Sequence, residues 1–261
     1  MSADTRRAEI IEILGGERYV KVADLSRRFS VSQMSIRRDL RQLEEQGLLS
    51  RAHGGMIATP LLRLGLEISP EVAGQIRDSR VEKREIARAA AALVQPGNHL
   101  IFDSGILSYF TACSLSGALL TQGELTVITN SLLVALELAP WSGVEMILLG
   151  GEYQAQHKMN VTGPSSLRSL EGLHADKMFL TVDGIELQHG VTTASEEVEL
   201  TQRMIAACAD VILLAAKGKI GWVDQTQILP ISVVRTLVTG KGAEAEVVAY
   251  LRDQGTEVIL A

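Results

Sequence analysis

Seven apolar runs alternate with helix-like segments across residues 99–261, and this alternation limits the possible folds of the chain more than any other feature. Runs such as HLIF (99–102), LTVIT (125–129) and VILLAA (211–216) are apolar along most of their length. A strand with one solvent-exposed face would instead alternate apolar and polar residues. Strands apolar on both faces, with helices between them, predict a mainly parallel sheet that is covered by helices on both sides.

The expected elements can be named from this pattern. The strand segments are HLIFDSG, LTVITN, VEMILLGGEY, KMFLTVDG, DVILLAA, TLVTG and TEVILA. The helical segments are EKREIARAAAALV, ILSYFTACSL, SLLVALELA, PSSLRSLEGL, SEEVELTQRMIAACA and AEAEVVAYLRDQG. We therefore predict a larger, Rossmann-like α/β domain with a mainly parallel sheet over residues 81–261.

Three shorter helices are expected in residues 1–57. The segments TRRAEIIEIL (5–14), VADLSRRFS (22–30) and VSQMSIRRDLRQLEEQGLL (31–49) repeat apolar residues at helical spacing. The inward positions are Ile10, Ile11, Leu14, Val22, Leu25, Phe29, Ile36, Leu40 and Leu43. Ser32 suits the N-cap of the third helix, and Gly47 suits its end. Because only residues 30–32 separate the second helix from the third, we predict a helix-turn-helix, whose second helix enters a DNA major groove.

The third helix carries three arginines away from its apolar stripe. Arg37, Arg38 and Arg41 precede the late acids Glu44 and Glu45, whereas the helix dipole favours acids early and bases late. A negatively charged partner explains this order, although a solvated face is the alternative for an isolated helix. The charge is divided accordingly. Residues 1–55 hold ten of the 25 Lys+Arg and eight of the 31 Asp+Glu, so this part is net +2 and the remainder is net −8.

A short hairpin is expected after the third helix. The segment LLSRAHGGMI (48–57) has strand-like flanks around a turn at Gly54–Gly55, and Arg51 and His53 precede that turn. A basic hairpin in this position forms a wing, which follows the DNA backbone or the minor groove. The segment that follows it lacks a sustained period, and we expect residues 58–80 to be a linker.

The N-terminal residues resemble one known family. The run RRAEIIEIL…VKVADLSRRFSVSQMSIRRDLRQLEEQGLLSRAHGG is similar to the N-terminal domain of the DeoR family of bacterial transcription regulators. The resemblance implies that Gln33 suits adenine, that an arginine suits guanine, and that Arg41 and Arg51 contact phosphates. The candidate DNA-binding residues are Ser32, Gln33, Met34, Ser35, Arg37, Arg38, Arg41, Arg51, His53 and Gly54.

Polar and glycine-rich segments follow the expected strands of the larger domain. In a parallel sheet, ligands bind outside the carboxyl ends of the strands, where glycines and helix N-termini present backbone N–H groups to anions. These segments predict a site for a polar or anionic small ligand, although Gly and Ser are also common turn residues. The candidates are Asp103, Ser104, Gly105, Thr129, Asn130, Ser131, Gly150, Gly151, Gly163, Ser165, Ser166, Asp183 and Gly184.

These segments also match the DeoR-family sensor domain in order, through DSG, VITNS, ILLGGEY, VTGPS, ADKMFLTVDGIE and HGVTT. The resemblance implies a fold similar to ribose-5-phosphate isomerase and a site for a phosphorylated sugar or a related metabolite. It adds Ser108, Glu196 and Lys219 to the candidate effector-binding residues. In two departures from the family pattern, ILS replaces the threonines that usually follow DSG, and AAKGKIG replaces ADSSKFG.

Three hypotheses about the larger domain stay open. It is a sugar-phosphate sensor, a sensor that has lost its phosphosugar effector, or a sugar-phosphate isomerase-like enzyme with an appended DNA-binding domain. Groups for proton transfer are present, among them Asp103, Asp183, Glu196, Glu197 and Lys219. The acids that start a helix are also explained by its dipole. We favour a regulator without catalytic activity, because a DNA-binding half makes sensing the simpler role.

No metal or cofactor is expected. The histidines are scattered, and Cys113 and Cys208 lack metal-type spacing, so both are expected to be small buried hydrophobes. The polar start and the absence of a long apolar run predict neither a signal peptide nor a membrane span, and hence a cytoplasmic protein. The resemblance implies a homo-oligomer, dimer or tetramer, that binds double-stranded operator DNA. Repression of a carbohydrate-metabolism operon is the expected outcome.

Overall fold

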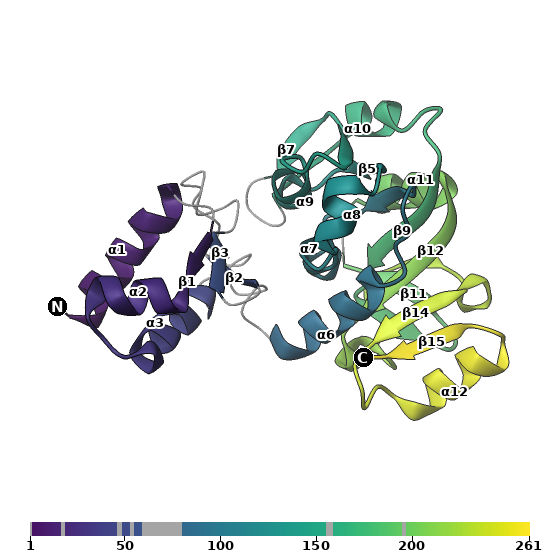
Figure 1. The fold of residues 1–261 in the computed structure, drawn as a ribbon. Helices are drawn as coiled ribbons and strands as arrows, with labels where there is room; N and C mark the ends of the chain where they lie inside the picture. The colour runs from purple at the N-terminus through teal and green to yellow at the C-terminus, as the bar shows by residue number, and fades with distance from the viewer. Residues whose placement is uncertain are drawn as a thin grey trace. The chain divides into compact units, whose positions relative to one another are not determined.

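The computed structural model describes residues 2–16, 19–45, 49–52, 55–58, 80–154, 159–194 and 197–261 (Figure 1). The chain divides into two compact units, Met1–Asp78 and Ser79–Ala261. The linker expected at residues 58–80 lies almost entirely outside the described residues.

The first unit contains the predicted helix-turn-helix and hairpin. Its elements are α1 (Ala3–Gly16), β1 (Tyr19–Lys21), α2 (Val22–Phe29), α3 (Gln33–Glu45), β2 (Leu49–Ala52) and β3 (Gly55–Ala58) (Figure 1). The chain leaves α2 at Ser30, which adopts the left-handed conformation with a φ of 53°. The predicted cap of α3 is confirmed, because the Ser35 backbone N–H donates to Ser32 Oγ at 3.2 Å.

One apolar core joins the three helices to the hairpin. Its buried members are Ile10, Leu14, Val20, Leu25, Phe29, Ile36, Leu40, Leu43, Leu49 and Met56. The predicted inward positions are confirmed, although Ile11 and Val22 are only partly buried at the margin of this core. The apolar stripe of α3 therefore faces the core, and the opposite side of α3 faces solvent.

The hairpin belongs to a three-stranded antiparallel sheet with the order β1-β3-β2. The sequence pattern does not predict β1, because three residues are too few to show a strand period. The expected turn at Gly54–Gly55 is wrong, since Gly55 belongs to β3 and pairs with Ala52 of β2. A side chain on Gly55 would collide with β1, because its Cβ would lie 2.1 Å from the Val20 carbonyl oxygen.

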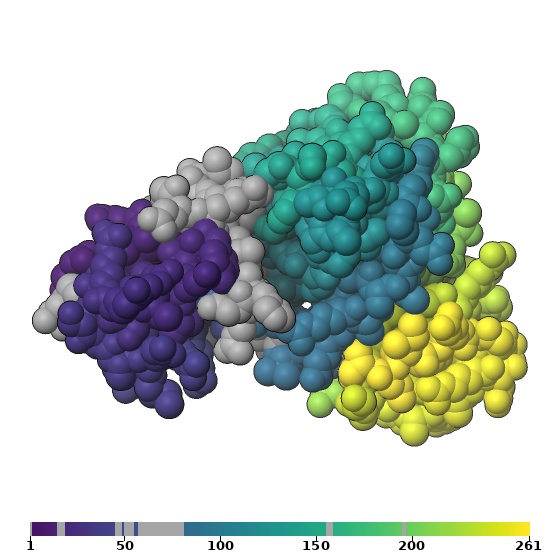
Figure 2. Space-filling model, in the orientation of Figure 1, coloured from purple at the N-terminus to yellow at the C-terminus, as the bar shows by residue number. Residues whose placement is uncertain are grey.

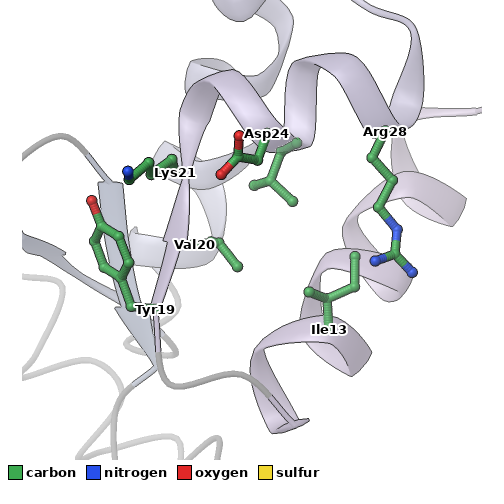
Figure 3. A pocket seen from close by; sticks show the side chains of 7 residues that line it. Ile13, Tyr19, Val20, Lys21, Asp24 and Arg28 are labelled. Carbon is green, nitrogen blue, oxygen red and sulfur yellow. The ribbon is translucent and has the colours of Figure 1, made fainter.

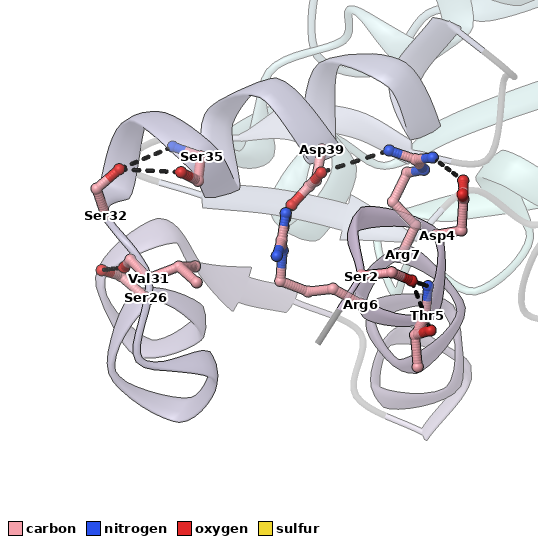
Figure 4. Close-up of polar contacts among 10 residues, drawn as sticks. All are labelled: Ser2, Asp4, Thr5, Arg6, Arg7, Ser26, Val31, Ser32, Ser35 and Asp39. Atoms are coloured by element: carbon pink, nitrogen blue, oxygen red, sulfur yellow. Dashed lines mark hydrogen bonds and ion pairs between the residues drawn. The ribbon is translucent and has the colours of Figure 1, made fainter.

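Asp39 of α3 is buried and ties α3 to α1 (Figure 4). Its Oδ2 accepts a hydrogen bond from Arg6 Nε at 2.5 Å, and its Oδ1 lies 3.5 Å from Arg7 Nη1. The side chains of Arg6 and Asp39 are only 10% and 3% exposed. Asp39 follows Ile36 by three residues and so lies on the buried side of α3. This ion pair fixes the rotation of α3, because a buried charge that loses its partner is strongly destabilising.

The second unit is built on a seven-stranded parallel sheet with the order β15-β14-β12-β9-β4-β5-β6. Its strands are β4 (His99–Phe102), β5 (Leu125–Thr129), β6 (Val144–Leu148), β9 (Ala175–Thr181), β12 (Cys208–Ala215), β14 (Thr236–Thr239) and β15 (Glu257–Leu260). All seven expected strands are present. The chain adds β5 and β6 on one side of β4, and then places β9 on the other side. The strand order therefore reverses between β4 and β9.

Helices cover both faces of this sheet, as predicted (Figure 1). They are α6 (Arg80–Ala91), α7 (Ile106–Cys113), α8 (Gly117–Gln122), α9 (Leu132–Leu138), α10 (Pro164–Ser169), α11 (Val198–Ala206) and α12 (Ala245–Asp253). On one face, Leu200 of α11 and Leu251 of α12 share a buried cluster with Met178 of β9. On the other, α7 packs against α6, α9 and β9, and the Phe102 and Phe179 rings stack with centroids 5.0 Å apart.

The last elements lie at one edge of the sheet. Helix α12 packs against β15, and this C-terminal part, in yellow, lies at the surface of the unit (Figure 2). Over the described ranges, no helix is both long and apolar enough to cross a membrane.

Smaller elements follow the carboxyl ends of the parallel strands, and the sequence pattern did not predict them. They are a hairpin of β7 (Glu152–Gln154) and β8 (Asn160–Thr162), and an antiparallel sheet of β10 (Gly184–Glu186), β11 (Gly190–Thr193) and β13 (Thr226–Leu229). The expected strand VEMILLGGEY is therefore two strands, separated by its paired glycines. The expected helix SEEVELTQRMIAACA ends at Ala206, because Cys208 pairs with Ala175 and so begins β12.

Gly105 lets the loop after β4 lie directly against β9. A Cβ on Gly105 would be 2.2 Å from Thr181 Cβ, which is closer than two carbon atoms can approach. The Ser108 backbone N–H donates to Thr181 Oγ1 at 3.1 Å, and Ser108 Oγ donates to the Phe179 carbonyl at 3.2 Å. The first turn of α7 is therefore fixed against the end of β9.

The first turn of α6 is held at the carboxyl ends of β12 and β14. Glu82 Oε1 accepts a hydrogen bond from the Lys217 backbone N–H at 2.6 Å, in the 3-10 turn Lys217–Lys219 that follows β12. The same carboxylate lies against Gly240, which follows β14. Because β4 begins at the amino ends of the strands, α6 and the residues after it lead the chain back from the carboxyl ends to the amino ends.

Replacing Asp39 by Asn is expected to destabilise the first unit by about 3 kcal/mol or more, because Arg6 then stays buried without a counter-charge. Urea denaturation of the full chain, together with hydrogen exchange of the α1 and α3 amides, measures this loss. Asp4→Asn is the matched control, because Asp4 is 89% exposed where it pairs with Arg7. The control is expected to change the free energy of unfolding by less than about 0.5 kcal/mol. Equal stability of the two variants would contradict the role given to Asp39.

Replacing Gly105 by Ala is expected to destabilise the second unit by about 1–3 kcal/mol, because the added methyl group forces the loop away from Thr181. Gly117→Ala, at the start of α8, is the control, since nothing lies within 4 Å of the added carbon. That variant is expected to be neutral or slightly stabilising. Urea unfolding of both variants measures the difference, and a Gly105→Ala protein as stable as Gly117→Ala would refute the packing argument.

Candidate nucleic-acid interface and ligand site

The outer face of α3 is polar, cationic and exposed. Its apolar residues face the core, so the candidate DNA-binding residues of this helix lie together on the other side. The exposed candidates are Ser32 at the cap, Gln33, Met34, Arg37, Arg38 and Arg41, and Ser35 is half-buried. Met34 is a large apolar side chain that is nevertheless 72% exposed. The fold thus gathers the candidates of α3 on a single surface.

The three guanidinium groups on this face have no counter-charge within the part of the chain that the structure describes. Arg37, Arg38 and Arg41 form no ion pair there, whereas Asp39 is engaged internally by Arg6 and Arg7. The first turn of α3 contains no acidic residue. The arginines and the positive end of the helix dipole therefore act together to attract an anion.

The candidates in the hairpin are only partly described. Arg51 lies in β2, where its backbone pairs with Met56 of β3. His53 and Gly54 lie outside the described residues. The described strands therefore place Arg51 on the hairpin that follows α3.

A cavity of about 210 Å³ lies elsewhere in the first unit (Figure 3). It is lined by Ile13, Tyr19, Val20, Lys21, Asp24, Leu25 and Arg28, which come from α1, β1 and α2. None of these residues belongs to α3, so the cavity is separate from the exposed face of that helix. Its lining combines charges of both signs, and Asp24 pairs with Arg27 at 2.5 Å.

In the second unit, ligand-site candidates meet where the strand order reverses. Asp103 follows β4, and its Oδ2 accepts a hydrogen bond from the Thr181 backbone N–H of β9 at 3.2 Å. Ser104 and Gly105 continue from Asp103 into α7, and Asn130 follows the adjacent strand β5. The crevice at such a reversal is where ligands bind in open parallel sheets.

Two asparagines converge on Glu197 at this point. Asn160 Nδ2 donates to Glu197 Oε1 at 2.5 Å and to Ser104 Oγ at 3.1 Å. Asn130 Nδ2 donates to Glu197 Oε2 at 3.4 Å. The exposed fractions of Asn130 and Asn160 are 1% and 0%. We call Ser104, Asn130, Asn160 and Glu197 the amide–carboxylate cluster.

Two members of this cluster were not predicted to bind ligand. Asn160 lies in β8, which the sequence pattern missed, and it reaches the cluster because it bridges to Ser131 in an antiparallel sense. Glu197 was explained by the dipole of the following helix, but its side chain makes no cap hydrogen bond to α11 and reaches the asparagines instead. Glu196, the predicted ligand residue, lies outside the described residues.

Three predicted hydroxyl groups are engaged within the fold. The hydroxyl of Ser108 is fully buried and donates to the main chain of β9. Thr129 Oγ1 donates to the Phe102 carbonyl at 2.7 Å and accepts from the Ser131 backbone N–H at 3.0 Å. Ser131 Oγ accepts from the Val134 backbone N–H at 3.3 Å and so caps α9. These groups position the strand ends and helices.

The glycine candidates border the β7–β8 hairpin. Gly150 and Gly151 separate β6 from β7, and Gly163 is the N-cap of α10. Ser166 is buried and its Oγ donates to the Gly150 carbonyl, whereas Ser165 is exposed. These contacts fasten α10 to the segment after β6.

The remaining candidates lie beyond β9 and β12. Asp183 Oδ2 accepts from Thr193 Oγ1 at 3.0 Å and from the Ala194 backbone N–H at 3.1 Å, which ties the end of β9 to β11. Gly184 begins β10, and Lys219 is half-buried at the end of the 3-10 turn after β12.

The thiols do not supply chemistry to this site. Burial raises the pKa of Cys113 well above its ordinary value and the pKa of Cys208 to about 11. Both groups therefore remain protonated at neutral pH, and neither offers the reactive thiolate. Within the described residues, no group of three or more His, Cys, Asp or Glu side chains is arranged to hold a metal ion.

The chain is similar to transcription regulators along nearly its whole length. A putative aga operon transcriptional repressor of Escherichia coli O157:H7 is 32% identical over 98% of this chain and 93% of the relative. The HTH-type transcriptional regulator YulB of Bacillus subtilis (strain 168), described as uncharacterized, is 32% identical over 97% and 95%. The HTH-type transcriptional repressor GlcR of the same strain is 30% identical over 100% and 97%.

Among solved structures, ribose 5-phosphate isomerase A from Methanocaldococcus jannaschii aligns with 53% of this chain and 53% of its own. The two chains are 12% identical, with a TM-score of 0.38. The DeoR C-terminal sensor domain matches residues 78–241, more than half of the chain, and the DeoR-like helix-turn-helix domain matches residues 6–59. The relatives are named as regulators and not as enzymes. The chain therefore belongs to the DeoR family of DNA-binding transcription regulators.

Proposed function

We propose that this regulator represses a carbohydrate-metabolism operon by binding double-stranded operator DNA, and that a phosphorylated sugar or a related metabolite controls it. The exposed, unpaired cationic face of α3 is the observation that carries the DNA-binding part. The printed names of the relatives, among them a putative aga operon repressor and the repressor GlcR, support repression and a link to sugar metabolism.

The exposed face of α3 reads the major groove. The amide of Gln33 suits adenine, and a guanidinium of Arg37 or Arg38 suits guanine through two parallel hydrogen bonds. Arg41, farther along the helix, and Arg51 in the hairpin contact phosphates and set the register without reading sequence. The buried ion pair of Asp39 with Arg6 supports this geometry, because it holds α3 in one rotation.

The effector lies at the strand reversal between β4 and β9. The first turn of α7 begins after Gly105 and contains no acidic residue, so the backbone N–H groups of Ile106 and Leu107 favour the phosphate, whereas that of Ser108 already donates to Thr181. Ser108 does not replace the missing family threonines, because its hydroxyl is engaged inside the fold. Backbone N–H groups therefore take most of the phosphate contacts, and Lys217 or Lys219 adds positive charge.

The effector controls DNA binding through its different affinities for two states of the protein. The effector must bind the DNA-competent and incompetent states unequally, because equal affinity shifts no population. We propose that the second units assemble a homo-oligomer, dimer or tetramer, so that two helix-turn-helix units reach two half-sites. The net charge of −8 on residues 56–261 discourages nonspecific DNA contact by this part of the chain.

Replacing Arg37 by Ala is expected to weaken operator binding by about 1–3 kcal/mol, because a base contact is lost. Fluorescence anisotropy with a promoter fragment that the protein selects from its own genome measures the affinity. Thermal unfolding is expected to stay unchanged, since Arg37 is exposed. Arg203→Ala, at an exposed arginine of α11, is the control and should bind as tightly as the parent. An unfolded Arg37→Ala domain whose folded fraction binds normally would show that α3 is oriented differently.

A panel of sugar phosphates is expected to include one that changes operator affinity by about fivefold or more, as is usual for coupled sites. The measurement is the same anisotropy titration with and without each compound, at fixed salt because DNA affinity depends strongly on salt. Operator binding that no compound changes would favour a regulator without a phosphosugar effector.

A further inference from the structure

The two amides of the amide–carboxylate cluster have a fixed orientation. Asn130 Nδ2 donates to the Val161 carbonyl at 3.3 Å as well as to Glu197. Asn160 Nδ2 donates to Ser104 Oγ as well as to Glu197. Turning either amide over would place its carbonyl oxygen against the carboxylate of Glu197, where both groups only accept hydrogen bonds. The two nitrogen atoms therefore face Glu197, and the two oxygen atoms point elsewhere.

Those two oxygen atoms are buried acceptors that receive no hydrogen bond from the described residues. Asn130 Oδ1 and Asn160 Oδ1 have no hydrogen-bond partner in that part of the chain, and both side chains are almost completely excluded from solvent. Buried polar atoms in folded proteins are nearly always hydrogen-bonded, because the unmade bond is costly. The two unmatched acceptors lie beside one carboxylate, at the carboxyl ends of the strands, where ligands bind. They indicate a site that is completed by a ligand that donates hydrogen bonds.

The chemistry of the cluster excludes the phosphate end of a ligand. Amide carbonyl oxygens and an ionised carboxylate accept hydrogen bonds, and a phosphate offers further acceptors and negative charge. Hydroxyl groups and ammonium groups are the donors that fit. Ser104 connects the two halves of the site, because it bonds to Asn160 and directly precedes Gly105, the N-cap of α7.

We propose that Asn130, Asn160 and Glu197 form a subsite for the polyhydroxyl or amino end of the effector, which donates to Asn130 Oδ1 and Asn160 Oδ1. This rests on the proposed function, in which the phosphate end occupies the first turn of α7. The subsite selects among sugar phosphates, because a compound without donors in the right place leaves the two buried oxygens unmatched. Glu197 holds the amides in place and strengthens the binding of an ammonium group.

Titration calorimetry with the full chain tests this subsite. The probes are inorganic phosphate and the 6-phosphates of glucose, galactose, fructose and glucosamine. For the sugar phosphate that binds most tightly, Asn160→Ala is expected to raise the dissociation constant at least tenfold, and so is Asn130→Ala. The affinity for inorganic phosphate should change less than twofold. Asn98→Ala is the matched control, because Asn98 lies at the opposite, amino end of β4.

Glu197→Gln distinguishes the two kinds of donor. If glucosamine 6-phosphate loses much more affinity than the other sugar phosphates, the subsite takes an ammonium group, and if all lose affinity equally, it takes hydroxyl groups. Both results support the subsite. Should Asn160→Ala fail to fold, Asn160→Ser and Glu197→Gln repeat the test with smaller changes.

Folded variants of Asn130, Asn160 and Glu197 that bind every sugar phosphate as tightly as the parent would overturn the subsite and leave the cluster a structural brace. That result would leave the proposal of a phosphorylated effector intact. If the parent protein binds none of the probes, the phosphorylated effector fails as well, so the two failures are distinguishable.

Discussion

The parallel pairing of β4 with β9 is the constraint on which the second unit depends. Because the strand order reverses there, the loops after β4 and β9 diverge and leave room for polar groups between them. Asp103 bridges the two strand ends, and Gly105 allows the start of α7 to lie against Thr181. The same edge receives Asn160, which is 56 residues from Ser104 in sequence but bonds to it. Each group of the candidate ligand site therefore owes its position to the sheet.

In the first unit, one face of α3 packs in the core and the opposite face is exposed and cationic. Three consecutive residues, Arg37, Arg38 and Asp39, divide between solvent and core, and the acid is the one that turns inward. An exposed arginine costs little, whereas a buried aspartate is tolerated only with a close counter-charge. Arg6 and Arg7 supply that charge from α1, so the outward face remains cationic. The order of charges in α3 follows from this division.

Long periodic segments could be predicted from the sequence, and short ones could not. The seven parallel strands and the buried stripe of Ile36, Leu40 and Leu43 were expected, because each pattern repeats over enough residues. Strands of three residues, such as β1 and β8, show no period, so the position of Asn160 was hidden with them. The burial of Asp39 was not predicted, although its spacing from Ile36 places it on the apolar face. Neighbouring carboxylates such as Glu196 and Glu197 look alike in sequence, and only tertiary contacts decide which one turns toward the asparagines.

The contact of Glu82 with Lys217 fixes where the second unit begins. It anchors the first turn of α6 at the carboxyl rim of the sheet, so the chain enters this unit beside the strand ends and not behind them. The start of α6 and the candidate metabolite site consequently share one rim of the sheet.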